Sequence, residues 1–191
     1  GDQRHQQLVG RIAESHDNER RLVTPRRLGG TGLDAVWSDD FHHGLHARLT
    51  GERAGYYGDY DDPRLLVRAL AQGFAYQGEP SVFWKCRRGT PSADLEGERF
   101  VVFVQNHDQV GNRTRSGRLT TTLPGEALRL TAGLLFVTPA IPLLFMGEEY
   151  GETAPFPFFT SFLDPRLADA VRQGRQAELR RVGWEGSIFD P

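Results

Sequence analysis

Residues 100–113 read Phe-Val-Val-Phe-Val-Gln-Asn-His-Asp-Gln-Val-Gly-Asn-Arg, an apolar run that stops abruptly in polar and ionisable side chains. Such a run is typical of a strand that is buried on both faces of a parallel sheet. In barrels of parallel strands, catalytic groups lie at the carboxyl ends of the strands. The stretch therefore predicts a strand over 99–105 that carries His107 and Asp108 to a functional site. The plainer alternative is a strand whose exit turn is merely polar.

Three other apolar segments also end in acidic residues. They cover 8–13, 34–37 and 140–146, and the acidic residues that follow them are Glu14, the pair Asp39 and Asp40, and the pair Glu148 and Glu149. Acidic residues are common in turns, so one or two such endings could arise by chance. All four strands share the feature, which predicts a row of carboxylates along one edge of a sheet or barrel.

The segments between these strands predict helices. A helix over 41–50 has apolar side chains at four-residue spacing, and Asp62 is a good N-cap for a second helix over 63–72. A third helix opens at Pro124 and is apolar nearly all round, so we expect it to be well buried. The Gly- and Pro-rich segment 78–97 suits an exposed excursion. Alternating strands and helices predict an α/β fold of parallel strands with outer helices.

The composition narrows the class of protein. The chain has 191 residues, 38% hydrophobic and 25% charged, as expected for a globular protein with a substantial core. The net charge of -2 argues against nucleic acid or an anionic membrane as the main partner. The single cysteine, Cys86, excludes an internal disulfide framework and fits a reducing compartment, so we expect a cytoplasmic protein. The first residues have no apolar signal-peptide core, and prolines interrupt the longest apolar stretch, so no membrane span is predicted.

Two carboxyl groups in different environments are what glycoside hydrolysis needs. A carboxyl crowded by apolar walls or by other carboxylates keeps its proton and can act as a general acid. One that accepts hydrogen bonds stays charged and can stabilise an oxocarbenium-like centre. Glu14 follows an apolar run and suits the first role, whereas Asp108, between His107 and Gln109, suits the second.

The motifs around these residues resemble those of the malto-oligosyltrehalose trehalohydrolases, a family of the α-amylase superfamily of glycoside hydrolases. The stretch over 103–113 is similar to the superfamily's fourth signature region, and Arg-Ile-Ala-Glu-Ser over 11–15 is similar to the third. Ala-Val-Trp-Ser-Asp-Asp-Phe-His-His over 35–43 and Leu-Leu-Phe-Met-Gly-Glu-Glu-Tyr-Gly over 143–151 are more particular to the trehalohydrolases. The resemblance covers nearly the whole chain.

The resemblance implies a role for each matching residue. Glu14 would be the general acid/base, Asp108 would stabilise the transition state, and His107 would contact sugar hydroxyls. The implied reaction is cleavage of the α-1,4 bond next to the terminal trehalose of maltooligosyl trehalose, with release of trehalose by a retaining mechanism. No metal or organic cofactor is implied. The residues that we expect to bind substrate are His107, Asp39, Asp40, His42, Gln109, Arg113 and Tyr57.

The sequence departs from the superfamily in its nucleophile. That nucleophile is an Asp in a Gly-x-Arg-x-Asp strand ahead of the Glu strand, and the thirteen residues before Glu14 contain no such motif. Asp34 is rejected because Gly32 takes the place of the Arg and the order is wrong. We therefore expect residues 1–183 to form the second half, about strands five to eight, of a (β/α)8 barrel, and 184–191 to begin a linker to a C-terminal β-domain. This part alone is expected to be inactive and to need the missing barrel half as its partner.

Several alternatives stay open at this point. The chain could belong to a branching or maltogenic enzyme of the same superfamily, or to a non-catalytic glucan-binding module. A weaker alternative is a metal-dependent hydrolase, since His42 and His46 are spaced to share a helix face. Asp39 and Asp40 could instead cap the helix that follows them, and Tyr57 suits packing as well as it suits a sugar ring.

Overall fold

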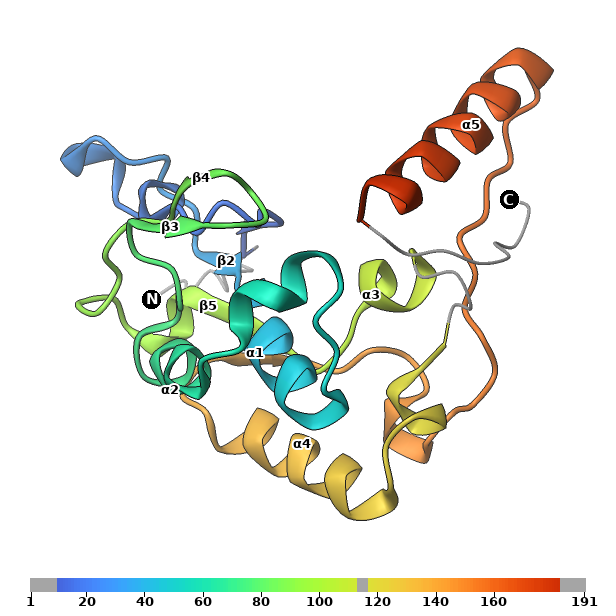
Figure 1. Ribbon diagram of the computed structural model, residues 1–191. Helices are drawn as coiled ribbons and strands as arrows, with labels where there is room; N and C mark the ends of the chain where they lie inside the picture. The colour runs from blue at the N-terminus through green and yellow to red at the C-terminus, as the bar shows by residue number, and fades with distance from the viewer. Residues whose placement is uncertain (1–9, 113–116, 183–191) are drawn as a thin grey trace, which may run out of the picture.

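The computed structural model describes residues 10–112 and 117–182 (Figure 1). The strands are β1 (Ile12–Ala13), β2 (Ala35–Trp37), β3 (Glu79–Ser81), β4 (Cys86–Arg88), β5 (Phe100–Phe103) and β6 (Ile141–Leu143). The α-helices are α1 (Asp39–Thr50), α2 (Pro63–Gln72), α3 (His107–Gly111), α4 (Gly125–Val137) and α5 (Pro165–Val182). The short 3-10 helices are η1 (Arg20–Leu22), η2 (Arg26–Leu28), η3 (Gly55–Tyr60), η4 (Gly97–Arg99), η5 (Leu119–Thr121) and η6 (Glu148–Tyr150).

One parallel sheet organises the chain, with strand order β1-β2-β5-β6. Its register places Ile12 opposite Ala35, Val36 opposite Phe100, and Val101 opposite Ile141. Parallel neighbours need crossover connections, and helices supply them: α1 and α2 lie between β2 and β5 in the chain, and α4 lies between β5 and β6. The predicted α/β fold of parallel strands with helices is confirmed. The carboxyl ends of all these strands meet at one edge of the sheet.

The helix boundaries follow from local chemistry. The Asp62 carboxylate accepts a hydrogen bond from the Arg64 N–H and caps α2, which begins with proline. Gly73 ends α2 with φ 82°. A Cβ at this position would lie 2.2 Å from the Phe100 ring, so glycine is required both for the left-handed backbone and for the approach of the helix to β5.

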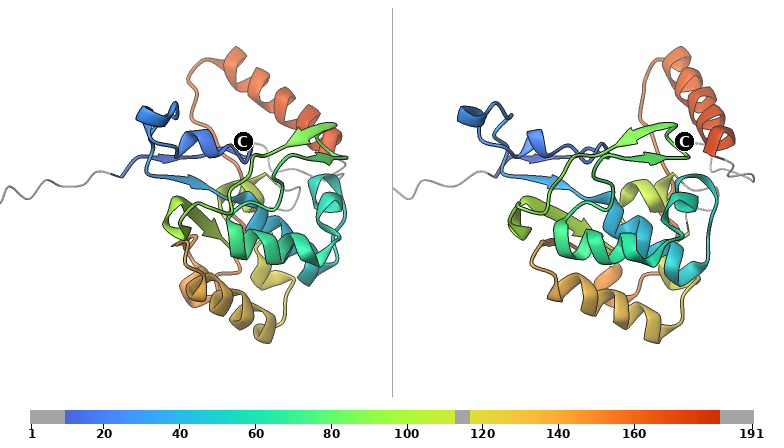
Figure 2. Two further views of the ribbon diagram at one scale, coloured as in Figure 1. Left: turned by 90° about the vertical axis from the view of Figure 1, so that its left-hand side faces the viewer. Right: turned by 60° about the vertical axis from the view of Figure 1, so that its left-hand side comes forward.

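The main core joins the helices to β5. Phe41 and Leu45 of α1 and Leu135 of α4 pack with Val102, and side chains of α2, such as Leu66, cover the same cluster. In Figures 1 and 2, α1, α2 and α4 lie below the β3–β4 hairpin and α5 as the molecule is drawn. The packing of these helices against β5 therefore fixes the strand whose carboxyl end leads to His107 and Asp108.

The hairpin corrects one expectation. Segment 78–97 was expected to be an exposed excursion, but β3 and β4 pair antiparallel within it. Ser81, Arg88 and Ser92 are all buried. Composition could not predict the burial of these residues because their side chains are polar. Hydrogen bonds hold them in place; the Ser92 hydroxyl, for example, donates to the Gln72 carbonyl at 2.6 Å.

Helix α4 and strand β6 are less buried than the sequence predicts. Only Thr131 and Leu135 of α4 are buried, whereas Leu130 is 54% and Phe136 61% exposed. Strand β6 is the last in the sheet order and is largely exposed. An apolar sequence predicts burial only where another segment covers it, and no described segment covers these faces.

Some predictions fall on residues that are not described. The amino end of the first strand, Arg113 and the linker over 184–191 lie outside residues 10–112 and 117–182. Within those two ranges, no helix combines the length and the apolar character that crossing a membrane requires.

Candidate active site

The two predicted catalytic carboxylates lie together. One ligand atom each of Glu14, His107 and Asp108 lies within 4.8 Å of the other two. The His107 Nε2 atom is 3.6 Å from the nearer Glu14 oxygen and 3.5 Å from the nearer Asp108 oxygen. The side chains are about half exposed and so are open to a ligand. They come from the carboxyl ends of β1 and β5, as the sheet predicts.

A helix cap sets the position of Asp108. The Asn106 side chain accepts a hydrogen bond from the Asp108 N–H at 2.8 Å, and the Gln109 side chain accepts one from the Asn106 N–H at 2.9 Å. This capping box starts α3, and three residues separate the helix from the end of β5. The Asn112 amide then donates to the Asp108 carboxylate at 2.9 Å, which holds that carboxylate toward solvent.

A cleft of about 240 Å³ lies beside Asp108. The residues that define it are His16, Asp39, His43, Tyr56, Trp84 and Asp108. We call this space the acidic cleft. It joins the loop after β1, the first turn of α1, η3 and the hairpin tip to α3, and Glu178 and Leu179 of α5 also line it. Carboxylates and aromatic rings in one concave space suit a polyhydroxylated ligand, because sugars offer hydroxyls at their edges and apolar faces.

The acidic cleft strongly changes the titration of Asp39, which lies in its wall. Burial raises the pKa of its carboxyl to about 7, and the nearby Asp40, Asp108 and Glu14 carboxylates add to the rise, against the Arg88 guanidinium. Near neutral pH, Asp39 therefore carries a proton part of the time and can donate a hydrogen bond as well as accept one.

Three predicted substrate contacts lie elsewhere. Asp40 is fully buried, and its carboxylate accepts hydrogen bonds from the Asn18 side chain at 2.5 Å and the Ala75 N–H at 2.6 Å. His42 donates from Nδ1 to the Val104 carbonyl at 2.5 Å, and its Nε2 accepts from the hydroxyl of the buried Tyr57 at 2.8 Å. Asp40, His42 and Tyr57 are thus engaged with interior partners, and their predicted contact with a sugar stays a prediction.

Gln109 and Asp34 have plain structural positions. Gln109 is buried and its oxygen completes the capping box, although its side chain also borders the acidic cleft. Asp34 lies at the amino end of β2, where it accepts a hydrogen bond from the Arg11 N–H at 2.7 Å. It is thus at the opposite end of the sheet from Asp108, which agrees with its rejection as nucleophile.

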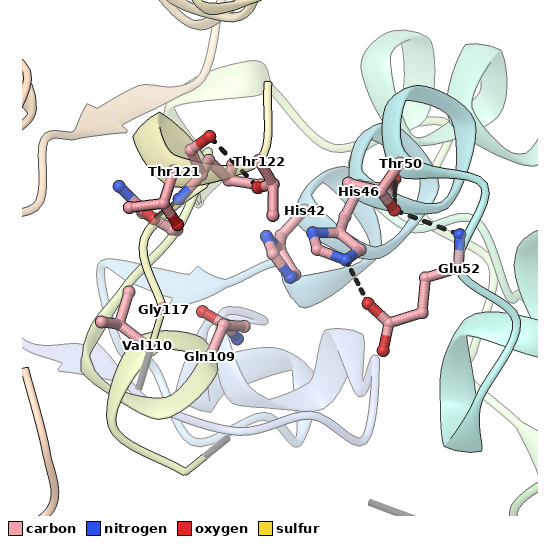
Figure 3. A pocket seen from close by; sticks show the side chains of 11 residues that line it. His42, His46, Thr50, Glu52, Gln109, Val110, Gly117, Thr121 and Thr122 are labelled. Atoms are coloured by element: carbon pink, nitrogen blue, oxygen red, sulfur yellow. Dashed lines mark hydrogen bonds and ion pairs between the residues drawn. The ribbon is translucent and has the colours of Figure 1, made fainter. Parts of the chain in front are cut away.

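A second cavity does not contain the catalytic pair. It measures about 450 Å³ and lies between α1, α3 and the segment 117–122 (Figure 3). His42 and His46 line it, and Figure 3 shows the His46 ring directed at the Glu52 carboxylate, 2.8 Å away. Both ring nitrogens of His42 are already engaged, so it cannot join His46 as a metal ligand. The arrangement argues against the histidine-based metal hydrolase.

The one group of three possible metal ligands found among the described residues is Glu14, His107 and Asp108 itself. Exposed acidic groups often cluster in this way without an ion, and the hydrolysis implied by the motifs uses these same side chains directly.

The predicted substrate-binding residues left out several residues of the acidic cleft. His43 is buried and neutral, since burial holds the pKa of its ring well below the usual value, and its Nδ1 has no hydrogen-bond partner among the described residues. The Trp84 indole stacks on His16 with ring centroids 4.9 Å apart. A tryptophan within a polar, Gly-rich segment was a usable signal, whereas nothing in the sequence separates His43 from His42.

Glu148 also ends a strand but does not reach the cleft. Its carboxylate accepts a hydrogen bond from the Phe145 N–H at 2.8 Å. Burial raises the pKa of Glu148 to about 7, partly offset by that hydrogen bond and by Gln105 and Arg118. Not all the acidic residues at the predicted strand ends lie in one row. Asp39 and Asp108 line the acidic cleft, whereas the Glu148 carboxylate binds the backbone of its own loop.

Comparison with known proteins gives relatives for nearly the whole chain. The malto-oligosyltrehalose trehalohydrolase of Saccharolobus solfataricus is 47% identical over 87% of this chain and 30% of its own length. The enzymes of that name from Rhizobium sp. and Mycobacterium tuberculosis are 44% and 38% identical over 94% of this chain, or 31% and 32% of their own lengths. No family model matches the chain.

A solved structure agrees with the sequence comparison. The crystal structure of a Salmonella typhimurium protein named "Putative alpha Amylase" superposes with a TM-score of 0.81 and 46% identity, covering 94% of this chain and 31% of that one. The chain spans about three tenths of the length of each of these proteins. The resemblance predicted from the motifs is thus confirmed, and the chain is related over most of its length to a segment of the malto-oligosyltrehalose trehalohydrolases.

Proposed function

We propose that this chain is part of a glycoside hydrolase that cleaves the α-1,4 bond next to the terminal trehalose of maltooligosyl trehalose and releases trehalose with retention. The observation that carries the proposal is the meeting of Glu14, His107 and Asp108 at the carboxyl ends of two parallel strands, beside a cleft with acidic and aromatic walls. The names of the relatives support the choice of substrate.

Four residues of the site have separate tasks in this reaction. Glu14 protonates the leaving oxygen and later removes a proton from the attacking water. Asp108, held ready by Asn112, stabilises positive charge at the anomeric carbon, and His107 donates a hydrogen bond to a sugar hydroxyl. Asp39, with its raised pKa, donates to another hydroxyl of the bound sugar.

The nucleophile is assigned to sequence outside these residues. We propose that residues 1–183 form strands five to eight of a (β/α)8 barrel and that 184–191 begin a linker to a further β-domain. The exposed edges of the sheet support this: Ile12 on β1 is 50% and Ile141 on β6 39% exposed, and a closed barrel has no such edges. Without the nucleophile, a retaining enzyme cannot form its covalent intermediate, so the 191 residues alone are expected to be inactive.

The proposal is tested with the protein expressed from all the sequence that its gene encodes. It is incubated with maltooligosyl trehalose and, separately, with a maltooligosaccharide of the same length, and the sugars released are separated by chromatography. Trehalose from the first substrate and little turnover of the second support the proposal. Glucan transfer or equal hydrolysis of both would instead indicate a branching or maltogenic enzyme.

Binding without turnover is the remaining alternative. A protein that retains the maltooligosaccharide on an affinity column but releases no sugar from either substrate would be a glucan-binding module. That result would refute hydrolysis and leave the acidic cleft as a binding surface.

A further inference from the structure

The buried guanidinium of Arg88 joins four segments of the chain. It donates to the His16 carbonyl at 2.7 Å and to the Tyr60 hydroxyl at 3.1 Å, and it lies 3.5 Å from the Asp40 carboxylate. Only 4% of Arg88 is exposed. The Tyr60 hydroxyl in turn donates to Asp40. The loop after β1, the first turn of α1, η3 and the hairpin therefore share one charged centre.

Each joined segment also carries a residue of the proposed site. Glu14 lies two residues before His16, and Asp39 lies directly before Asp40. On η3, Tyr56 lies four residues before Tyr60. On the hairpin, Trp84 lies four residues before Arg88. A shift of any one segment would move a group that faces the acidic cleft, although Arg88 does not line the cleft itself.

The hydrogen bonds of Asp40 fix this centre in the fold. Its carboxylate accepts from Asn18 on the loop after β1 and from the Ala75 and Tyr76 N–H groups beyond α2. A fully buried carboxylate paired with a buried cation is costly to form, and removing one partner leaves an uncompensated buried charge. The planar guanidinium of Arg88 points its N–H donors in several fixed directions, which the ammonium group of a lysine cannot reproduce.

We propose that Arg88 is a positioning residue for the reaction, holding the loop that carries Glu14 and the turn that carries Asp39 at the geometry that hydrolysis needs. The proposal rests on the proposed function for its kinetic consequences, but the positioning itself can be measured without substrate. Arg88 also acts on the cleft electrostatically, since its charge opposes the rise in the pKa of Asp39 caused by burial and by Asp40, Asp108 and Glu14.

The test compares four variants of the protein expressed from its full gene. Arg88→Met removes the donors but keeps the side-chain length, and Arg88→Lys keeps the charge but loses the planar guanidinium. Arg87→Met is the matched control, because Arg87 is the exposed neighbour on the same strand. Asp40→Asn combined with Arg88→Met removes both buried charges. This double variant has no unpaired buried charge, so it can recover stability although the guanidinium is absent.

A misplaced catalytic group can cost about 100-fold in rate, so we expect Arg88→Met to lower kcat/KM by about that factor, with most of the loss in kcat. Arg88→Lys should recover the melting temperature better than the activity. The double variant should melt near the Arg87→Met control while its kcat stays low. The pH at which Asp39 titrates in the kcat/KM profile should rise in Arg88→Met and stay in place in Arg88→Lys.

Hydrogen exchange supplies a readout that needs no activity. Loss of a charge-assisted hydrogen bond should raise amide exchange over residues 14–18 by about tenfold in Arg88→Met and in the double variant, and leave the control unchanged. Unchanged exchange over 14–18 in both variants, or full recovery of kcat in the double variant, would overturn the proposal. If the wild type released no trehalose, the proposed function would fail, and the exchange data would still decide whether Arg88 positions the loop.

Discussion

Asp39 should make the stability of the protein fall as the pH rises from about 4 to about 7. Its carboxyl has a pKa of about 7 in the folded protein against the ordinary 3.8, so the folded state holds a proton that the unfolded state releases in this window. Raising the pH therefore favours unfolding until the folded-state carboxyl has also ionised. The stability that this proton provides is fully present below pH 4 or so and is lost as the pH passes through about 7.

The size of the effect follows from the shift. A difference of roughly three pKa units corresponds to about 4 kcal/mol, and partial solvent exposure of Asp39 reduces the expected value to about 2 kcal/mol. Asp39→Asn keeps the shape of the side chain and removes the titration. The variant should therefore be about 2 kcal/mol more stable than the wild type at pH 8 and nearly equal to it at pH 4.

Urea unfolding at a series of pH values measures this directly. Glu148→Gln is the matched control, because the pKa of Glu148 is also raised to about 7 by burial, at a site away from the acidic cleft. Each variant should remove part of the pH dependence of the free energy of unfolding. The double variant, Asp39→Asn with Glu148→Gln, should remove the sum of the two parts. If Asp39→Asn left the slope between pH 4 and pH 7 unchanged, the raised pKa of Asp39 would be refuted.

Two further predictions concern the fold and are read by thermal or urea unfolding. Gly73→Ala should destabilise by about 2–4 kcal/mol, because φ is 82° and the new Cβ would meet the Phe100 ring, whereas Gly51→Ala, with φ 75° and open space, should cost about 1 kcal/mol. Equal costs at the two glycines would contradict the close approach of α2 to β5. Leu135→Ala should cost about 2–5 kcal/mol and Leu130→Ala less than about 0.5, since the first side chain is buried and the second is half exposed. A large loss at Leu130 would show that its face of α4 is covered.

The strands and helices were predictable because their signals are local. The apolar run before Asn106 gave β5, and Asp62 with Pro63 gave the start of α2. Glu14 and Asp108 were found because parallel strands bring their carboxyl ends together, and this needs only the order of elements. The family resemblance came from motifs that the relatives share.

What the sequence could not predict depends on long-range contacts. Asp39 and Asp40 are adjacent and chemically identical, yet one borders the acidic cleft and the other is fully buried among backbone donors. The difference arises from the direction in which each side chain leaves the first turn of α1. Arg88 belongs to a polar hairpin, and nothing local indicates that its partners lie 28 and 72 residues away in the chain.

The most direct test of the central claim is trehalose release by variants of the two carboxylates in the protein expressed from its full gene. Glu14→Gln should lower kcat by about 10²–10⁴-fold and Asp108→Asn by about 10²–10³-fold, since the first removes the acid/base and the second the charge that stabilises the transition state. Asp34→Asn, at the opposite end of the sheet, should leave kcat unchanged. Full activity in Glu14→Gln or Asp108→Asn, or its loss in Asp34→Asn, would contradict this account of the site.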